Sequence, residues 1–139
     1  MAREVLHKVY FSLGSNLGDK ESNIREAISR MAGLIGTVER QSTLLVTEPW
    51  GFESSNSFVN AAVCCSTTLT PRQVLEATKA IERAMGRTQK SADGIYHDRI
   101  IDIDILLYDD LHVNDPDLKI PHPLMHEREF VMKPLGEII

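Results

Sequence analysis

The chain has 139 residues, of which 42% are hydrophobic and 25% charged, the composition of a soluble globular protein. At this length we expect a single domain over residues 1–139 with an ordinary hydrophobic core. The formal net charge of −5 argues against nonspecific binding to nucleic acid or to an anionic membrane. No apolar stretch approaches the ~20 residues that a membrane helix needs.

Two local features bear on the cellular compartment. The first residues, Met1 to Glu4, do not open a signal-peptide pattern. Cys64 and Cys65 are adjacent, so on a strand they would point to opposite faces, and we interpret them as buried free thiols rather than a disulfide. Both features favour a cytoplasmic protein.

Hydrophobic periodicity and turn signals predict the elements in chain order. The first helix has Asp19 as its N-cap, and the second has Thr70 as N-cap, Pro71 at the first helical position and Gln73 completing a capping box. The predicted elements are a strand at 7–13, a helix from Asp19 to Leu34, strands at 38–47 and 58–68, a helix from Pro71 to Met85, a strand at 100–108, a small hairpin or loop at 109–118, and a short helical turn at 123–129.

The order of the main elements is β-α-β-β-α-β. This order predicts an α+β fold of the ferredoxin-like type, a sandwich with an antiparallel sheet and a small C-terminal extension.

The last main strand carries two acidic residues inside an apolar run. The odd positions from Ile101 to Leu107 would share one face, and Asp102 and Asp104 the other, with Cα atoms roughly 6.5–7 Å apart. Two carboxylates at that spacing can bind one Mg²⁺ or bridge two, because hard cations prefer oxygen ligands. Two acids on a solvated sheet face are the alternative, but aspartate is depleted in strands, so the pattern favours a metal site.

Basic residues gather near this strand. Arg99 lies three residues before Asp102, where it could reach a phosphate on a metal held by the aspartates. Arg87 and Lys90 lie in the polar segment before it. Guanidinium groups suit phosphate oxygens, whereas ordinary surface charge is the alternative for most basic residues.

Two other features leave alternatives open. The segment 14–18 leads from a strand into a helix and is either a tight turn or a loop that presents backbone N–H groups to an anion. His122 and His126 have the spacing of a helical zinc pair, but Pro121 and Pro123 disfavour a continuous helix there. His122 could instead donate a hydrogen bond to a phosphate.

An aromatic ring and an amide share one face of the third strand. Phe58 offers a surface for stacking and Asn60 offers a donor and an acceptor, a pair that suits a flat heterocycle. Trp50 lies in a loop flanked by Pro and Gly. Core packing is the alternative for Trp50, Phe58 and Phe130.

Together these pieces resemble the 6-hydroxymethyl-7,8-dihydropterin pyrophosphokinase family of folate biosynthesis. The resemblance runs from about Val9 to Gly136, and its most specific part is an Arg-x-x-Asp-x-Asp segment followed by Pro-His and Arg-x-Phe. The matching segments are Gly14 to Gly18, Thr47 to Gly51, Phe58 to Ala62, Gly86-Arg87, Arg99 to Asp104, Pro121-His122, and Arg128 with Phe130.

The resemblance implies a Mg²⁺-dependent enzyme that transfers the pyrophosphoryl group of ATP to the pterin's hydroxymethyl oxygen and releases AMP. It implies catalytic roles for Asp102, Asp104, Arg87 and Arg99, with Asp102 and Asp104 holding two Mg²⁺ ions. It implies ATP contacts from Arg87, Lys90, Arg99, Ile105, His122 and Arg128, and pterin contacts from Thr47, Pro49, Trp50, Phe58, Asn60 and Phe130.

The expected partners are therefore the small molecules ATP and 6-hydroxymethyl-7,8-dihydropterin, with no nucleic acid and no membrane, and we expect a monomer. One rival is a nucleotidyl transferase or cyclase on the same type of sheet, which usually draws its acids from different strands. The other is a regulatory nucleotide-binding domain, which would need neither the acidic pair nor the aromatic residues.

Overall fold

The structure is a computed structural model that describes residues 5–47, 57–86 and 100–139. The elements are β1 (His7–Ser15), α1 (Lys20–Leu34), β2 (Thr37–Gln41), β3 (Leu45–Thr47), β4 (Phe58–Thr67), α2 (Pro71–Ala84), β5 (Asp102–Tyr108), β6 (Val113–Asp115), β7 (Leu118–Ile120), the 3₁₀-helix η1 (Met125–Glu127) and α3 (Glu129–Ile138).

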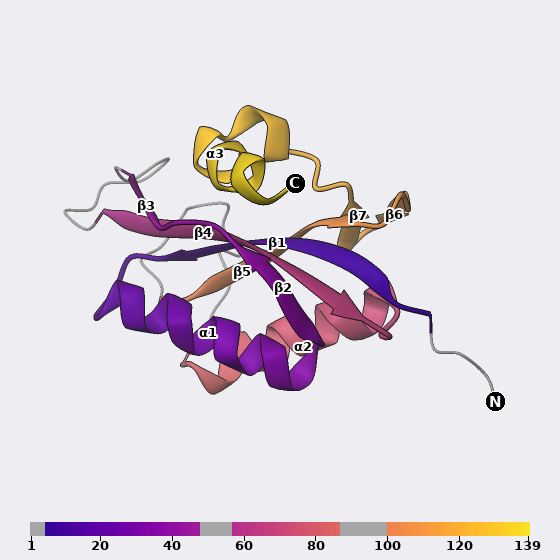
Figure 1. The fold of residues 1–139 in the computed structure, drawn as a ribbon, viewed down its shortest axis with the longest axis horizontal. Helices are drawn as coiled ribbons and strands as arrows, with labels where there is room; N and C mark the ends of the chain where they lie inside the picture. Colours follow the sequence, from indigo (N-terminus) through magenta and orange to yellow (C-terminus); the bar gives the residue numbers. More distant parts are fainter. Residues whose placement is uncertain (1–4, 48–56, 87–99) are drawn as a thin grey trace.

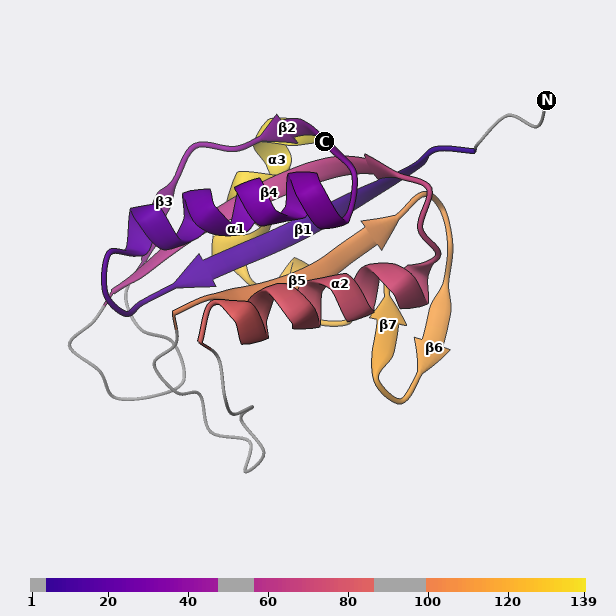
Figure 2. The same cartoon turned by 90° about the horizontal axis from the view of Figure 1, so that it is seen from below.

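The main sheet is antiparallel, with the strands in the order β2-β4-β1-β5 and β3 also paired with β4. Helices α1 and α2 cover one face of this sheet, and α3 covers the other (Figure 1). Figure 2 shows α1 and α2 side by side across the sheet, with the β6–β7 hairpin beyond the edge at β5. This arrangement confirms the ferredoxin-like prediction.

Capping and close packing explain where the two large helices begin and end. Thr70 and Gln73 form the predicted capping box, and the Asp19 side chain accepts a hydrogen bond from the Ser22 amide. A Cβ atom at Gly36 would lie 2.0 Å from the carbonyl oxygen of Ser66, so only glycine fits where the chain leaves α1 and enters β2.

Each face of the sheet has its own core. The face under α1 and α2 buries Val9, Phe11 and Leu13 of β1, and the face under α3 buries Ala62 and Leu106. Cys65 belongs to the first core and Cys64 to the second, and both are free thiols, as predicted. Burial raises the pKa of Cys65 to about 12.

A β-bulge corrects the prediction for one residue of β5. The pairing register between β1 and β5 shifts between Tyr10 and Phe11, so the Leu106 position has no partner of its own in β1. As a result Leu106 and Leu107 both pack on the α3 side, while Ile105 and Tyr108 belong to the other core. The expectation that Leu107 shares a face with Ile101 is therefore wrong.

Three further parts of the chain differ from the prediction. The strand expected at 38–47 is interrupted at 42–44, where the Thr43 amide and hydroxyl donate hydrogen bonds to the Glu137 carboxylate. The hairpin lies at 113–120 rather than 109–118. The predicted turn at 123–129 contains η1, but helix α3 was not predicted.

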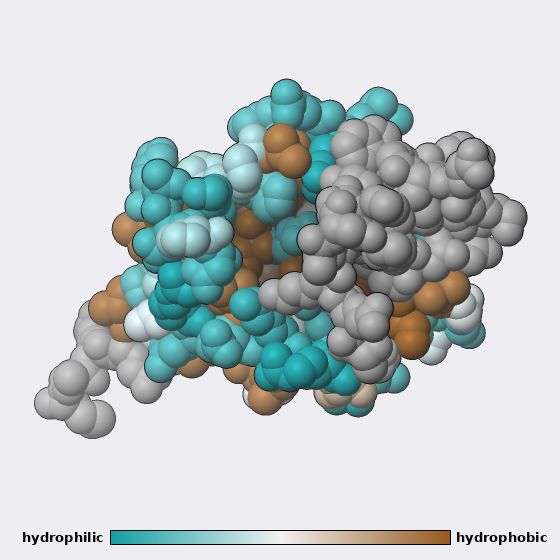
Figure 3. Space-filling view, turned by 180° about the vertical axis from the view of Figure 1, so that it is seen from behind, coloured by the Kyte–Doolittle hydropathy of each residue, from teal (hydrophilic) through white to brown (hydrophobic). Residues whose placement is uncertain are grey.

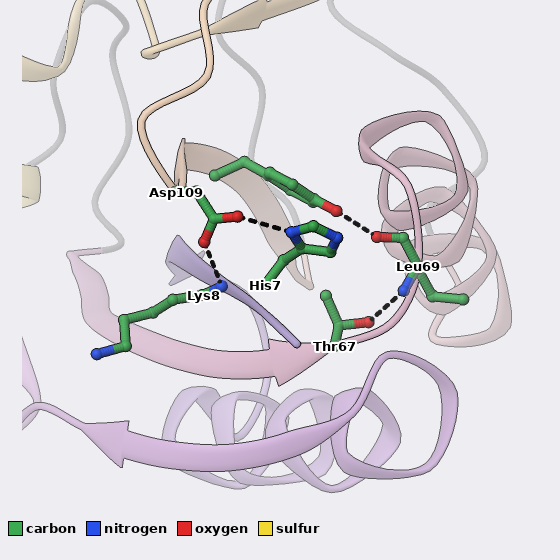
Figure 4. Close-up of polar contacts among 6 residues, drawn as sticks. His7, Lys8, Thr67, Leu69 and Asp109 are labelled. Carbon is green, nitrogen blue, oxygen red and sulfur yellow. Dashed lines mark hydrogen bonds and ion pairs between the residues drawn. The ribbon is translucent and has the colours of Figure 1, made fainter. Parts of the chain in front are cut away.

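A polar network ties the beginning of β1 to the end of β5, far from the acidic pair. The Asp109 carboxylate bonds the His7 ring at 2.7 Å and accepts a 2.7 Å hydrogen bond from the Lys8 amide (Figure 4). The Tyr108 hydroxyl donates to the carbonyl of Leu69 and so links β5 to the segment before α2. Asp109 has a φ of 48°, which suits the turn after the strand.

None of the helices in the described ranges is both long enough and apolar enough to cross a membrane.

Candidate functional site

The two aspartates of β5 lie opposite the end of β1. Asp102 pairs with Gly14 and Asp104 with Ser12, and both carboxylate side chains are half-buried. The intervening Ile103 is buried in the core under α1 and α2. Because side chains alternate along a strand, Asp102 and Asp104 share the face that α3 covers elsewhere. The sequence prediction that they share one face is therefore confirmed.

A row of paired residues runs from Asp102 across the sheet. Asp102 pairs with Gly14, Gly14 pairs with Asn60, and Asn60 pairs with Leu45. Directly paired residues point to the same face of a sheet, so Asn60 and Asp102 share a face. They are two strands apart, which corresponds to roughly 10 Å. The strand order thus brings together residues that are 42 positions apart in the chain.

Gly14 forms the floor between these two residues. A Cβ atom there would lie 3.2 Å from Asn60 Oδ1 and 3.6 Å from Cδ1 of Phe58. The sequence reading treated Gly14 as the start of the loop, but the structure has it inside β1, so its role was missed. The available signal was a glycine beside a strand pattern, which often marks a close approach of backbone and side chain.

The Asn60 amide is held in one orientation. Its side chain is 3% exposed, and Nδ2 donates a 2.8 Å hydrogen bond to the Thr47 hydroxyl. Thr47 itself pairs with Phe58 across β3 and β4. Thr47, Phe58 and Asn60, three residues that the resemblance associates with pterin, therefore form one contiguous group.

His122 follows β7 and lies along the outer edge of β5. Its backbone amide donates to the carbonyl of Leu106 at 3.0 Å, and its Nδ1 accepts from the Leu124 amide at 3.2 Å. Since Nδ1 is the acceptor, the proton of the neutral ring is on Nε2. Burial and the nearby Arg128 cation lower the pKa of His122, while Asp102 acts in the opposite direction. A neutral His122 at pH 7 can donate one hydrogen bond from Nε2.

Arg128 and Phe130 stand at the beginning of α3. Arg128 is the N-cap residue of that helix, and its Cζ lies 5.8 Å from the centroid of the Phe130 ring, a cation–π distance. Phe130 is partly buried against the core under α3. The Met125 amide donates to the carbonyl of His122, and the Arg128 amide donates to the carbonyl of Met125, so the beginning of α3 is tied to the segment after β7.

A hollow of about 270 Å³, which we call the β5 hollow, lies beside Asp104. Figure 3 views the molecule from the side of β5, and hydrophobic side chains lie at the bottom of a depression bordered by hydrophilic ones. The residues that line the β5 hollow come from α2, β5, the hairpin and the segment after it, and they include Leu75, Asp104, Ile105, Leu118, Lys119 and His122.

Several predicted site residues lie outside the described residues. These are Pro49, Trp50, Arg87, Lys90 and Arg99. The other predicted residues lie in smaller groups. Thr47, Phe58 and Asn60 are adjacent, and Asp104, Ile105 and His122 line the β5 hollow. Arg128 lies over the Phe130 ring, and Asp102 and Arg128 both act on His122.

The donor set of the acidic pair suits magnesium. Over residues 5–47, 57–86 and 100–139, no group of three or more His, Cys, Asp or Glu side chains is arranged to hold a metal ion. Mg²⁺ is commonly bound through one or two carboxylates, with phosphate oxygens and waters as the remaining ligands. Two half-buried aspartates beside a hollow therefore fit a magnesium ion that arrives with a phosphorylated substrate.

Comparisons with known proteins agree with this chemistry. A family sequence profile described as 7,8-dihydro-6-hydroxymethylpterin-pyrophosphokinase (HPPK) matches residues 10–139. The 2-amino-4-hydroxy-6-hydroxymethyldihydropteridine pyrophosphokinase of Porphyromonas gingivalis is 49% identical over 131 residues, which cover 94% of this chain and 89% of that protein. The protein of the same name from Bacillus subtilis is 40% identical over 130 residues, which cover 93% of this chain and 76% of that protein.

A solved structure of a Plasmodium falciparum HPPK-DHPS chain has a TM-score of 0.76 to this structure, at 16% sequence identity. The match covers 99% of this chain but only 42% of the length of that one. At this identity the likeness supports the fold alone.

Proposed function

Because this chain belongs to the 7,8-dihydro-6-hydroxymethylpterin-pyrophosphokinase family, we propose that its Asp102 and Asp104 hold two Mg²⁺ ions at the reacting phosphates. The reaction transfers the pyrophosphoryl group of ATP to the hydroxymethyl group of 6-hydroxymethyl-7,8-dihydropterin, giving AMP and the pterin diphosphate in folate synthesis. The observation that carries the proposal is the row Asp102–Gly14–Asn60, which joins a metal-binding pair to a heterocycle-binding group.

The pterin lies over Gly14, between the acidic pair and Asn60. The Asn60 amide forms hydrogen bonds with the polar edge of the ring, in an orientation that its bond to the Thr47 hydroxyl fixes. Phe58 supplies one stacking surface and Phe130 the other, and the family resemblance adds Pro49 and Trp50 as further pterin contacts. A bicyclic ring with a one-carbon arm spans the roughly 10 Å between Asn60 and Asp102, so the hydroxymethyl oxygen reaches the aspartates.

ATP approaches from the opposite side of Asp104, with its purine in the β5 hollow against Ile105. His122 donates from Nε2 to a phosphate oxygen, and Arg128 adds positive charge close to it. Arg87, Lys90 and Arg99 neutralise further phosphate charge. The two substrates thus meet at one pair of carboxylates.

Alignment and charge neutralisation account for most of the rate in this kind of transfer. When bound, Mg²⁺ would neutralise phosphate charge and make the accepting hydroxyl more acidic. We assign the acceptance of the hydroxyl proton to Asp104. The absence of a side chain at Gly14 leaves space for the acceptor, because a Cβ atom there would contact Asn60 and Phe58.

We further propose that residues 1–139 act as one domain, that the protein is a monomer, and that it works in the cytoplasm. The two free thiols, Cys64 and Cys65, support the cytoplasmic part of this proposal.

The test is a chromatographic assay for AMP with purified protein, ATP and Mg²⁺, with and without 6-hydroxymethyl-7,8-dihydropterin. We expect AMP and pterin diphosphate in equal amounts, and only when the pterin is present. Pyrophosphate release without AMP would instead indicate a cyclase or nucleotidyl transferase. ATP binding without any turnover would indicate a regulatory domain.

A further inference from the structure

A carboxylate from α2 holds the peptide group between the two aspartates. Ile103 lies between Asp102 and Asp104, and its amide donates a 2.8 Å hydrogen bond to Glu82 Oε2. Glu82 is 8% exposed and lies two residues before the end of α2. The contact is buried, so water does not compete with it.

The position of β5 explains why this contact is needed. β5 is at the edge of the main sheet, with β1 as its only neighbour in the described strand order. In an antiparallel pair, alternate residues direct their N–H groups toward the partner and the others direct them outward. Glu82 satisfies an outward N–H that a further strand would otherwise pair with, and a buried amide without a partner would be costly.

Helix stability alone does not favour an acidic residue at this place. The C-terminal turn of a helix carries partial negative charge, so a carboxylate there is unfavourable. Burial adds a desolvation cost. Glu82 also borders a second hollow, of about 290 Å³, together with Asp102, Asp104 and Asp117, which places four acidic residues around one space with Lys79 as the basic residue of its lining. An acidic side chain at this unfavourable position is better explained by the hydrogen bond that it accepts from the Ile103 amide.

We propose that Glu82 is a positioning residue for the acidic pair, and this inference rests on the proposed role of Asp102 and Asp104 in binding Mg²⁺. The hydrogen bond fixes the plane of the peptide between Asp102 and Ile103. That plane sets the direction in which the two aspartates leave the strand. A bond to a buried side-chain oxygen makes this edge of the sheet more rigid than a bond to water would.

Two substitutions distinguish the hydrogen bond made by the Glu82 side chain from the effect of its negative charge. Glu82→Gln keeps an oxygen at the same distance but removes the charge, whereas Glu82→Asp keeps the charge but draws the oxygen away from the Ile103 amide. If Glu82 acts through the hydrogen bond, Gln preserves its role and Asp does not. If Glu82 acts only as a nearby negative charge, the order is reversed.

The matched control is Thr78→Val, one turn earlier on the same helix. Thr78 is 2% exposed, and its hydroxyl donates a hydrogen bond to the carbonyl of Leu75 within the same helix. Its substitution perturbs α2 to a degree that thermal melting measures, and it leaves the Ile103 hydrogen bond in place.

Three measurements are made on each full-length variant: hydrogen exchange of the Ile103 amide by NMR, calorimetric binding of Mg²⁺ with a non-hydrolysable ATP analogue, and the melting temperature. For Glu82→Asp we expect at least about tenfold faster Ile103 exchange and about tenfold weaker Mg²⁺ binding. For Glu82→Gln both quantities should stay within about threefold of wild type. Thr78→Val should lower the melting temperature without weakening Mg²⁺ binding.

Wild-type Mg²⁺ binding in Glu82→Asp would overturn the inference, as would a larger loss in Glu82→Gln than in Glu82→Asp. An equal loss in Thr78→Val would also overturn it, because the effect would then be one of helix stability. A wild-type chain that forms no AMP would contradict the proposed function instead, and it would leave the exchange of Ile103 as an independent measurement.

Discussion

At the scale of single residues, the candidate site depends on how closely three groups approach one another. Asn60, Phe58 and Gly14 come from β4 and β1, and the absence of a side chain at Gly14 creates the space above it. The shared face of Asp102 and Asp104 could be predicted because the alternation of a strand is fixed by its geometry. The contact between Gly14 and Asn60 could not, because it depends on which strands become neighbours.

Gly14→Ala tests the floor of the site. Its Cβ would stand 3.2 Å from Asn60 Oδ1, so the amide must shift, and we expect pterin binding to weaken about tenfold with little change in ATP binding. Calorimetry with each ligand measures both effects. The control is Gly33→Ala, whose Cβ would meet nothing within 4 Å and which should stabilise α1 by about 0.5–1 kcal/mol. Unchanged pterin affinity in Gly14→Ala would show that this surface is not the pterin site.

Asn60→Ala tests recognition of the ring edge. The substitution leaves a polar edge of the bound pterin unpaired, which we expect to cost about 1–3 kcal/mol of pterin affinity and far less ATP affinity. Isothermal titration with each ligand gives the comparison. Asn114→Ala on the exposed hairpin is the control, since its side chain accepts a hydrogen bond from Lys119 on the surface of the hairpin. Equal losses of both ligands would argue against a selective role for Asn60.

The surroundings of His122 make a prediction about its titration. Burial lowers the pKa of this ring, Arg128 lowers it further, and Asp102 acts in the opposite direction. NMR should therefore find the His122 pKa below its ordinary value of about 6.5. It should fall further in Asp102→Asn and rise in Arg128→Gln. An unchanged His122 pKa in both variants would mean that Asp102 and Arg128 do not lie close enough to His122 to affect it.

At the scale of elements, hydrophobic alternation and capping predicted the strands and the two large helices. The structure differs from the prediction where contacts between elements determine the local conformation. The bulge at Leu106 cannot be read from an apolar run, because Ile, Leu and Leu in succession suit either face. Helix α3 contains Pro134 and Gly136, which favour a helix end, yet Val131, Leu135 and Ile138 pack against the sheet and stabilise it.

The junction of β1 and β5 predicts a dependence of stability on pH. Burial opposes ionisation of Asp109, but hydrogen bonds from the Lys8 amide and the His7 ring outweigh it and lower the pKa of the carboxyl. The ionised group therefore stabilises the fold above its unfolded pKa of about 3.9, and this contribution is lost as pH falls through the lower folded pKa.

Asp109→Asn should thus lose about 1 kcal/mol of unfolding free energy at pH 7, a value already reduced for solvent screening at this exposed site. The difference from wild type should shrink as pH falls below about 4. Urea unfolding at several pH values measures it. Asp110→Asn, at the next and exposed position, should show neither effect; a constant difference at every pH would contradict the role of the ionised carboxylate.

At the scale of the whole molecule, the strand order explains why one end of the sheet carries both groups of the proposed site. β1 lies between β4 and β5, so the residues that favour a heterocycle and those that favour a metal share one face (Figure 1). The β-α-β-β-α-β order predicted this arrangement of the strands. It could not predict the hollow beside β5, whose walls come from α2, the hairpin and the segment after it.

The central claim is that Asp102 and Asp104 hold the magnesium on which transfer depends, and turnover of Asp102→Ala and Asp104→Ala tests it most directly. Neither side chain belongs to the two cores, so both variants should keep the wild-type circular dichroism. Each removes a ligand worth several kcal/mol in the transition state, so pterin-dependent AMP formation should fall by about a thousandfold or more. Asp110→Ala should remain at the wild-type rate. Near-wild-type turnover with Mg²⁺ in either β5 variant would contradict the account.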